Sequence, residues 1–205
     1  MKISCTKTGK RFNRDWIFRN FSYVFIKGGH YAITGPNGSG KSTLLQVIAG
    51  AIVSSEGNIS YESGEQKLVT DNIFTSLAIA APYLEVIEEM TLMELLQFHR
   101  IFKPFLPGVV EEDMIAIMGL QAAAHKQIRY YSSGMKQRVK LAQAIFSDTP
   151  CLLLDEPCTN LDDAGTQLYH QLIEKYCKDR LVIVSSNDKQ EYSFCNEVVN
   201  IMSYK

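Results

Sequence analysis

A glycine-rich stretch in the first quarter of the chain constrains the fold more than any other feature. Its residues are Gly35, Pro36, Asn37, Gly38, Ser39, Gly40, Lys41, Ser42 and Thr43. They fit the phosphate-loop pattern GxxxxGKS/T, with a strand-like apolar run before it at 31–33 and a helix-like run after it at 44–49. A glycine-rich turn that only caps a helix is the alternative. The Lys-Ser pair and both flanks favour a loop that binds nucleotide phosphates.

The residue types of this loop suit phosphate chemistry. Glycines let successive backbone N–H groups converge at a helix N-terminus, where the helix dipole also favours an anion. The ammonium group of Lys41 can reach the β- and γ-phosphates, and the hydroxyl of Ser42 can ligate Mg²⁺. We therefore expect a nucleotide and Mg²⁺ at residues 35–43.

The bulk composition is that of a globular protein with almost no net charge. The chain has 205 residues, 46% of them hydrophobic, and a mean hydropathy of -0.07, which exclude a disordered chain. Its 21 Lys and Arg against 22 Asp and Glu give a net charge of -1, which disfavours a nucleic-acid partner.

No apolar run approaches the roughly 18 residues of a membrane span, and the first residues lack the apolar core of a signal peptide. Five cysteines without a CxxC pair disfavour disulfide and metal frameworks, so we expect a soluble protein of a reducing cytosol.

Strand-like and helix-like patterns alternate along the chain. The predicted strands are 2–12, 21–26, 58–61, 77–80, 151–154, 181–184 and 198–202, and the predicted helices are 91–102, 111–118, 132–147, 162–177 and 189–195. This alternation predicts an α/β fold with a mainly parallel sheet covered on both faces. The insert of about 86–129 is helical. Ligands of such sheets bind at the carboxyl ends of the strands.

Two carboxylates, Asp155 and Glu156, follow the apolar run 152–154 directly. Asp155 is placed to hold the Mg²⁺ shell, and Glu156 to polarise a water molecule for attack on a γ-phosphate. A solvated acidic turn is an equally good explanation of this segment alone. Beside a phosphate loop, the catalytic interpretation is favoured.

A third motif carries a family resemblance. The residues 131–138, Tyr-Ser-Ser-Gly-Met-Lys-Gln-Arg, resemble the signature motif of ATP-binding-cassette (ABC) ATPases, and 159–162 resembles the D-loop of that family. The motifs stand in the family's order, and the resemblance covers about 12–187. Ser132 and Ser133 also occupy N-cap positions, where a helix N-terminus makes a second anion site. A plain serine-capped helix is the alternative.

The resemblance implies a fold and an activity. The fold is a P-loop NTPase of ABC ATPase type, α/β, with a mainly parallel core sheet, an N-terminal antiparallel β-subdomain and a small helical subdomain. It forms one domain over 1–205, with its core at 1–85 and 130–205 and the helical subdomain at about 86–129. The activity is ATP hydrolysis with Mg²⁺. Two copies, as a homodimer or a cassette heterodimer, would enclose ATP between Lys41 of one and Ser132, Ser133 and Gly134 of the other, beside Asp162.

Three motifs depart from the family pattern. The signature has Ser133 and Met135 where the family has Gly and Gln. The family's Q-loop glutamine falls at Tyr83, so that Tyr83 or Glu85 is expected to make the coupling contact, and packing of Tyr83 at a strand end is the alternative. The family's switch histidine falls at Asn187, which can donate a hydrogen bond but carries no proton, so hydrolysis is expected to be slow.

An aromatic side chain is expected to stack on the adenine. Phe12 lies 29 residues before Lys41, about where the family has this aromatic. Trp16 is the rival candidate, and either residue could belong to the core instead. We favour Phe12.

The resemblance points to the ATP-binding and ATP-hydrolysing subunit of a transporter, with a membrane permease as a separate chain. The permease would dock on the helical insert and on 83–89, which would place the protein in the cytoplasm at the inner face of the membrane. The insert resembles those of small exporter cassettes, including those of cytochrome-c maturation. ABC-type ATPases of DNA repair, chromosome structure or translation are the alternative, and their long inserts or tandem cassettes do not match this chain. A kinase or GTPase would not explain Ser132–Gly134.

Overall fold

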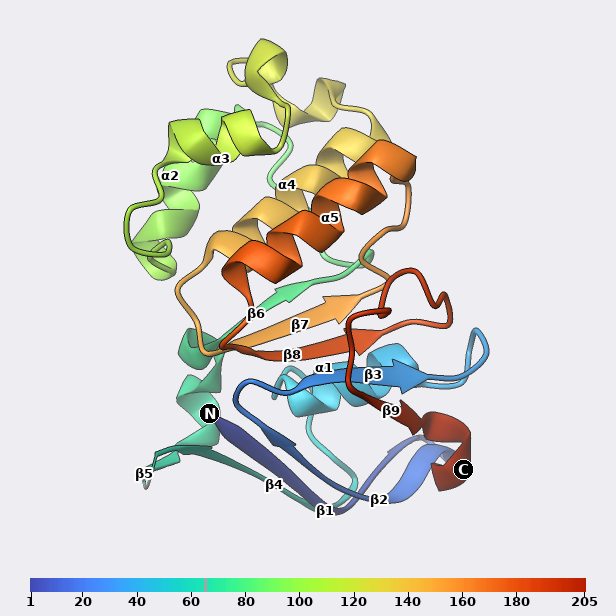
Figure 1. Ribbon diagram of the computed structural model, residues 1–205. Helices are drawn as coiled ribbons and strands as arrows, with labels where there is room; N and C mark the ends of the chain where they lie inside the picture. The colour runs from blue at the N-terminus through green and yellow to red at the C-terminus, as the bar shows by residue number, and fades with distance from the viewer. Residues whose placement is uncertain (65) are drawn as a thin grey trace. The chain divides into compact units, whose positions relative to one another are not determined.

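The computed structural model describes residues 1–64 and 66–205, which form two compact units (Figure 1). The first unit contains residues 1–79, 150–155 and 179–205. The second contains residues 80–149 and 156–178. The predicted helical subdomain of 86–129 falls within the second unit, and its boundaries stay a prediction.

The first unit holds two sheets. The antiparallel sheet has the order β2-β1-β4-β5, with β1 at Lys2–Phe12, β2 at Asp15–Ile26, β4 at Glu56–Ser63 and β5 at Gln66–Leu68. The second sheet has the order β6-β7-β8-β3-β9, with β6 at Leu77–Ala80, β7 at Cys151–Asp155, β8 at Leu181–Ser185, β3 at His30–Thr34 and β9 at Glu197–Asn200. The pairs β7–β8, β8–β3 and β3–β9 are parallel. The expected α/β fold with a mainly parallel sheet and an N-terminal antiparallel sheet is confirmed.

The core of the first unit explains why these strands form. β7 and β8 are buried along their whole length, as expected of apolar runs covered on both faces. Helix α1, Lys41–Ile48, lies against β1, β7 and β8, and its residues Leu44, Leu45 and Ile48 are completely buried. Each such side chain contributes about 2 kcal/mol of hydrophobic free energy. This burial fixes the N-terminus of α1.

The second unit is helical. Its longer helices are α2 at Leu92–Phe102, α3 at Glu111–Ile117, α4 at Ser133–Phe146 and α5 at Asp163–Tyr176, and its 3-10 turns are η2 at Gln121–Ala123 and η3 at Ile128–Tyr130. Helix α4 packs against α2 and α5. Thr91 and Glu94 form the predicted capping box at the start of α2, with Thr91 N donating to Glu94 Oε2 at 2.8 Å. Within the described chain, none of the helices has the length and apolar character needed to cross a bilayer.

Two predictions near the C-terminus are wrong. Residues 189–194 form turns and not a helix, with Asp188 Oδ1 accepting from Gln190 N and Asp188 O accepting from Glu191 N. The closing strand ends at Asn200, whose Oδ1 caps the 3-10 turn η4 at Ile201–Tyr204. The 3-10 segment η1 at Thr70–Ser76 was not predicted.

A histidine in the second unit is held neutral by a directional hydrogen-bond chain. Ser147 Oγ donates to Gln143 O, so it accepts from His99 Nε2 at 2.9 Å. His99 Nδ1 then accepts from Gln143 Nε2 at 3.3 Å. The His99 ring also stacks on Phe105, with 5.7 Å between ring centroids. Burial first, and then the charge of Lys103, lower the pKa of His99 to about 4.

We therefore predict that protonation of His99 lowers the free energy of unfolding in acid. The unfolded chain binds a proton on this residue below pH 6.5 and the folded chain only below about 4. The contribution of His99 to stability is thus fully present above pH 6.5 and is lost as the pH falls from 6.5 to about 4. His99→Gln should flatten the pH dependence of urea unfolding in this window.

Exposed His125 provides the control. His125→Gln should leave the pH dependence as it is in the unchanged protein. An equal slope for His99→Gln and the unchanged protein between pH 6.5 and 4 would contradict the assignment.

Candidate nucleotide site

The predicted phosphate loop joins β3 to α1 in the first unit. Gly40 is the N-cap of α1 and has a left-handed backbone, with φ of 93°. A Cβ atom there would lie 2.3 Å from Ile17 Cγ2, so both the conformation and the space require glycine. Gly40 offers no side-chain cap, and the first turn of α1 contains no acidic residue. The N–H groups of this turn can therefore meet an anion from solution.

Lys41 places a positive charge inside this loop. Its side chain is only 4% exposed. Lys41 Nζ donates to Gly35 O at 2.9 Å and to Pro36 O at 3.3 Å. The loop carbonyls thus hold the ammonium group at the anion-binding end of α1, where it can exchange a carbonyl for a phosphate oxygen.

Buried oxygen atoms gather at the carboxyl ends of the central strands. Asp155 ends β7 and is paired in register with Ser185 at the end of β8, which is paired in turn with Ile33 of β3. Asp155 Oδ1, Ser185 Oγ and Ser39 Oγ are buried, and none has a hydrogen-bond partner among the described residues. Buried polar atoms rarely stay unpaired. These oxygens, with Ser42 in the first turn of α1, fit the oxygen ligands and water shell that Mg²⁺ prefers.

Asn187 lies beside the phosphate loop. It follows β8 by two residues, and its Nδ2 donates to Asn37 Oδ1 at 3.3 Å. The amide that stands where the family has its switch histidine therefore forms a direct hydrogen bond with a side chain of the loop. Its role toward ATP stays a prediction.

Phe12 and Trp16 flank the tip of the β1–β2 hairpin. Phe12 is 49% exposed, with Lys10 Nζ 5.0 Å from the ring centroid. Trp16 is half-buried. The Cζ atoms of Arg19 and Arg11 lie 4.4 Å and 5.5 Å from the centroid of its ring. Cations thus lie over both rings, and Phe12 offers the more open surface for an adenine because it is exposed whereas Trp16 is half-buried.

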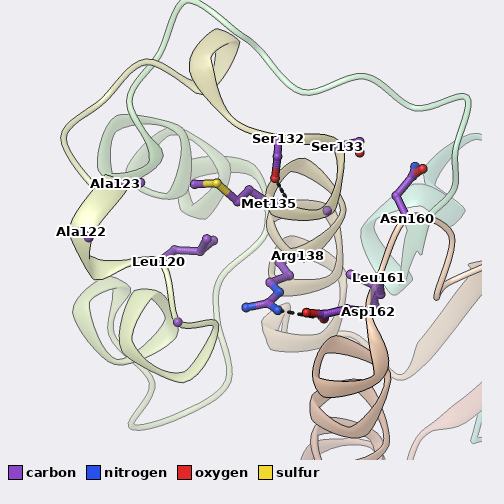
Figure 2. Close-up of a pocket in the computed structure, with 12 residues that line it drawn as sticks. Leu120, Ala122, Ala123, Ser132, Ser133, Met135, Arg138, Asn160, Leu161 and Asp162 are labelled. Atoms are coloured by element: carbon purple, nitrogen blue, oxygen red, sulfur yellow. Dashed lines mark hydrogen bonds and ion pairs between the residues drawn. The ribbon is translucent and has the colours of Figure 1, made fainter.

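A second candidate site lies wholly within the second unit, at the N-terminus of α4 (Figure 2). It is a cavity of about 420 Å³ whose lining includes Ser132, Ser133, Gly134, Met135, Asn160 and Asp162. Ser132 is the N-cap of α4, and its Oγ accepts from Met135 N at 3.3 Å. The N–H groups of Ser133 and Gly134 precede the first intrahelical bonds and remain available to an anion. The three predicted signature residues thus line one cavity.

The D-loop packs directly on the signature. A Cβ atom at Gly134 would lie 2.8 Å from Asn160 O, so only glycine allows this approach. Asp162 caps α5 by accepting from Gly165 N at 2.8 Å, and it also accepts from Arg138 Nη2 at 3.3 Å. The bond from Gly165 and the charge of Arg138 lower the pKa of Asp162. Asp162 therefore serves as a helix cap and an ion-pair partner in this chain, in addition to the nucleotide contact that we predict.

Glu156 follows β7 with a left-handed backbone, at φ of 42°. Such a conformation costs about 1 kcal/mol or more and is often found at functional sites. A residue of α4 holds the turn that follows Glu156: Gln137 is 3% exposed, and its Nε2 donates to Pro157 O at 2.7 Å.

The two residues predicted to make the coupling contact, Tyr83 and Glu85, lie in an exposed segment. Tyr83 is 44% exposed.

Sequence reasoning missed two groups of residues at these sites. Ser185 ends an apolar run just as Asp155 does, and this shared position was a signal that could have identified it. The sequence contains no comparable signal for the contacts of Gln137 and Arg138, because these contacts depend on which loops pack against α4.

Comparison with known proteins identifies a family. A model of the ABC transporter family matches residues 18–159. The uncharacterized ABC transporter ATP-binding protein YybJ of Bacillus subtilis is 31% identical, over 91% of this chain and 86% of that protein. The cytochrome c biogenesis ATP-binding export protein CcmA of Mesorhizobium japonicum is 31% identical, over 91% of each chain.

Solved structures show the same fold. A putative ABC transporter ATP-binding protein from Pyrococcus furiosus has a TM-score of 0.82 at 20% identity and covers 100% of both chains. A bacterial ABC transporter cassette solved as a dimer has a TM-score of 0.82 at 21% identity, over 97% of this chain and 94% of that one.

The contact of Gly134 with Asn160 leads to a prediction. Alanine favours helix over glycine by about 1 kcal/mol, but here its methyl group would press on the Asn160 carbonyl. Gly134→Ala should therefore lower the free energy of unfolding by about 1–3 kcal/mol, measured by urea denaturation. Ser133→Ala, at the exposed neighbouring position, adds no atoms and serves as the control. Stabilisation by Gly134→Ala would contradict the predicted clash.

Proposed function

The chain belongs to the ABC transporter family, and from this premise we propose that it is the ATP-hydrolysing subunit that drives a separate membrane permease. ABC ATPases bind and hydrolyse ATP, and this chain is an ABC transporter ATP-binding subunit. The observation that carries the proposal is the set of buried, unpaired oxygens of Ser39, Asp155 and Ser185 in the unit that holds the phosphate loop and the charge of Lys41. This arrangement suits a nucleotide with its metal ion.

Each residue of the site has a proposed task. The N–H groups of 38–43 and the Lys41 ammonium bind the β- and γ-phosphates. Ser42 and Asp155 would hold Mg²⁺, which when bound neutralises phosphate charge. Glu156 orients a water molecule and takes its proton as that water attacks the γ-phosphate. Asn187 donates a hydrogen bond to the γ-phosphate, and Phe12 stacks on the adenine.

A second copy would complete the site. The phosphate loop belongs to the first unit and the signature cavity to the second, and each has the open N–H groups of a helix start. In a head-to-tail dimer, Ser132, Ser133 and Gly134 of one copy would bind the γ-phosphate held by Lys41 of the other. ATP would hold the two copies together, and hydrolysis at Glu156 would release them.

The permease would dock on the second unit. Segment 83–89 exposes Leu84 at 37% and Ile87 at 40%, together with carboxylates such as Glu85. Exposed apolar residues mixed with charges are typical of a protein contact surface. Docking there would place the subunit in the cytoplasm at the inner face of the membrane, and the permease would select the cargo.

We predict that binding and hydrolysis of ATP can be separated by two substitutions. Lys41→Ala removes a charge-assisted hydrogen bond and should weaken ATP binding roughly 10- to 100-fold, measured by calorimetry. Glu156→Gln should retain ATP binding but lower turnover about 100-fold or more, measured by phosphate release.

Exposed Glu174 on α5 provides the matched control for the second substitution. Glu174→Gln should hydrolyse ATP at the rate of the unchanged protein. Full turnover in Glu156→Gln would refute the role of Glu156, and unchanged ATP affinity in Lys41→Ala would refute the phosphate loop as the binding site.

Replacing Asn187 tests why turnover should be slow. An imidazole can carry a proton and a charge near neutral pH, whereas an amide cannot. Asn187→His should therefore raise the turnover number roughly 10-fold with little change in ATP affinity, measured by steady-state kinetics. An unchanged or lower turnover number would contradict the proposed switch role.

A further inference from the structure

The segment between β6 and α2 is held at both of its ends by one helix. Lys140 Nζ donates to Pro82 O at 3.0 Å and to Ala81 O at 3.4 Å. Lys136 Nζ forms an ion pair with Glu88. The two lysines are four residues apart on α4, so they project from the same helix face. We call residues 82–88 the linker.

The apolar residues of the linker lie between these two anchor points. Tyr83, Leu84 and Ile87 are 44%, 37% and 40% exposed. Only Leu84 N→Ala81 O and Met90 N→Ile87 O close local backbone turns in the described part of this stretch. The exposed residues of the linker thus lie between its contact with Lys140 and its contact with Lys136.

The same helix carries the signature at its N-terminus. Ser132 caps α4, Lys136 lies one turn further along and Lys140 two turns. The intrahelical bonds of α4 make these turns one stiff unit, with a rise of about 1.5 Å per residue. A displacement of the linker therefore acts on the helix that positions Ser132, Ser133 and Gly134.

The contacts of Lys140 differ from those of an ordinary surface ion pair. It bonds two backbone carbonyls, and no carboxylate lies within ion-pair distance of it in the described chain. Burial lowers the pKa of Lys140, against the opposite effect of Glu85. Because carbonyls are present whatever the side chains are, this grip does not depend on the residue at position 83, where the family has glutamine.

We propose that Lys140 and Lys136 are positioning residues that couple the linker to the signature of the same chain through α4. The inference rests on the proposed function, since it assumes that ATP acts on the signature and that a permease acts on the linker. It gives the chain a coupling route through the backbone carbonyls of Ala81 and Pro82 and through the carboxylate of Glu88.

Amide hydrogen exchange of the full chain tests this coupling. The hydrolysis-deficient Glu156→Gln protein is compared with and without Mg²⁺ and ATP, which should slow exchange of both 132–137 and 83–88. Adding Lys136→Met and Lys140→Met should abolish the ATP effect at 83–88 and keep it at 132–137. Without ATP, exchange at 83–88 should become about tenfold faster, while ATP affinity stays within about twofold.

Two further variants separate coupling from misfolding. Lys140→Arg retains donors for the two carbonyls and should keep the ATP effect at 83–88. Lys178→Met changes an exposed lysine after α5 and should have no effect on either segment.

The outcomes distinguish the two proposals. ATP protection of 83–88 that persists without both lysines, while 132–137 is protected, would overturn the coupling through α4 and leave the proposed function standing. No ATP protection at 132–137 in the protein with both lysines would overturn the proposed dimeric site and, with it, this inference.

Discussion

The parallel register of β7, β8 and β3 is the constraint on which the nucleotide site depends. It brings Asp155 of β7, Ser185 of β8 and the chain end of β3 to one edge of the sheet. A shift of one residue would turn the Asp155 side chain to the other face of the sheet. The burial of both strands, which specifies this register, therefore also specifies where the carboxylate of Asp155 lies. Stability and function rest on the same pairing.

Helix α4 has the corresponding role in the second unit. Its N-terminus presents the signature, its residues Gln137 and Arg138 hold the loop after Glu156, and its residues Lys136 and Lys140 hold the linker. One element thus determines the geometry of the signature, of the D-loop and of the proposed docking segment. Because all three segments contact this one helix, a displacement of one segment can be transmitted to the other two.

The sequence predicted those features that depend on local chemistry. Glycine spacing identified the phosphate loop, apolar runs identified the strands, and Ser132, Thr91 and Asp162 identified helix starts that the structure confirms. The turns at 189–194 were missed because the bond from Gln190 N to Asp188 Oδ1 occurs at helix starts and in turns alike. The contacts of Lys136 and Lys140 could not be predicted, because they depend on the tertiary approach of a segment about 50 residues away in the chain. The catalytic and binding roles assigned to the site residues remain predictions.

The central claim is that each copy supplies half of every ATP site. Sedimentation velocity of the Glu156→Gln protein, with and without Mg²⁺ and ATP, tests it most directly, because blocked hydrolysis should trap the closed form. We predict a monomer without ATP, a dimer with ATP, and a monomer in both conditions once Lys41→Ala is added. A Glu156→Gln protein that stays monomeric at saturating ATP would contradict a site shared between two copies of this chain.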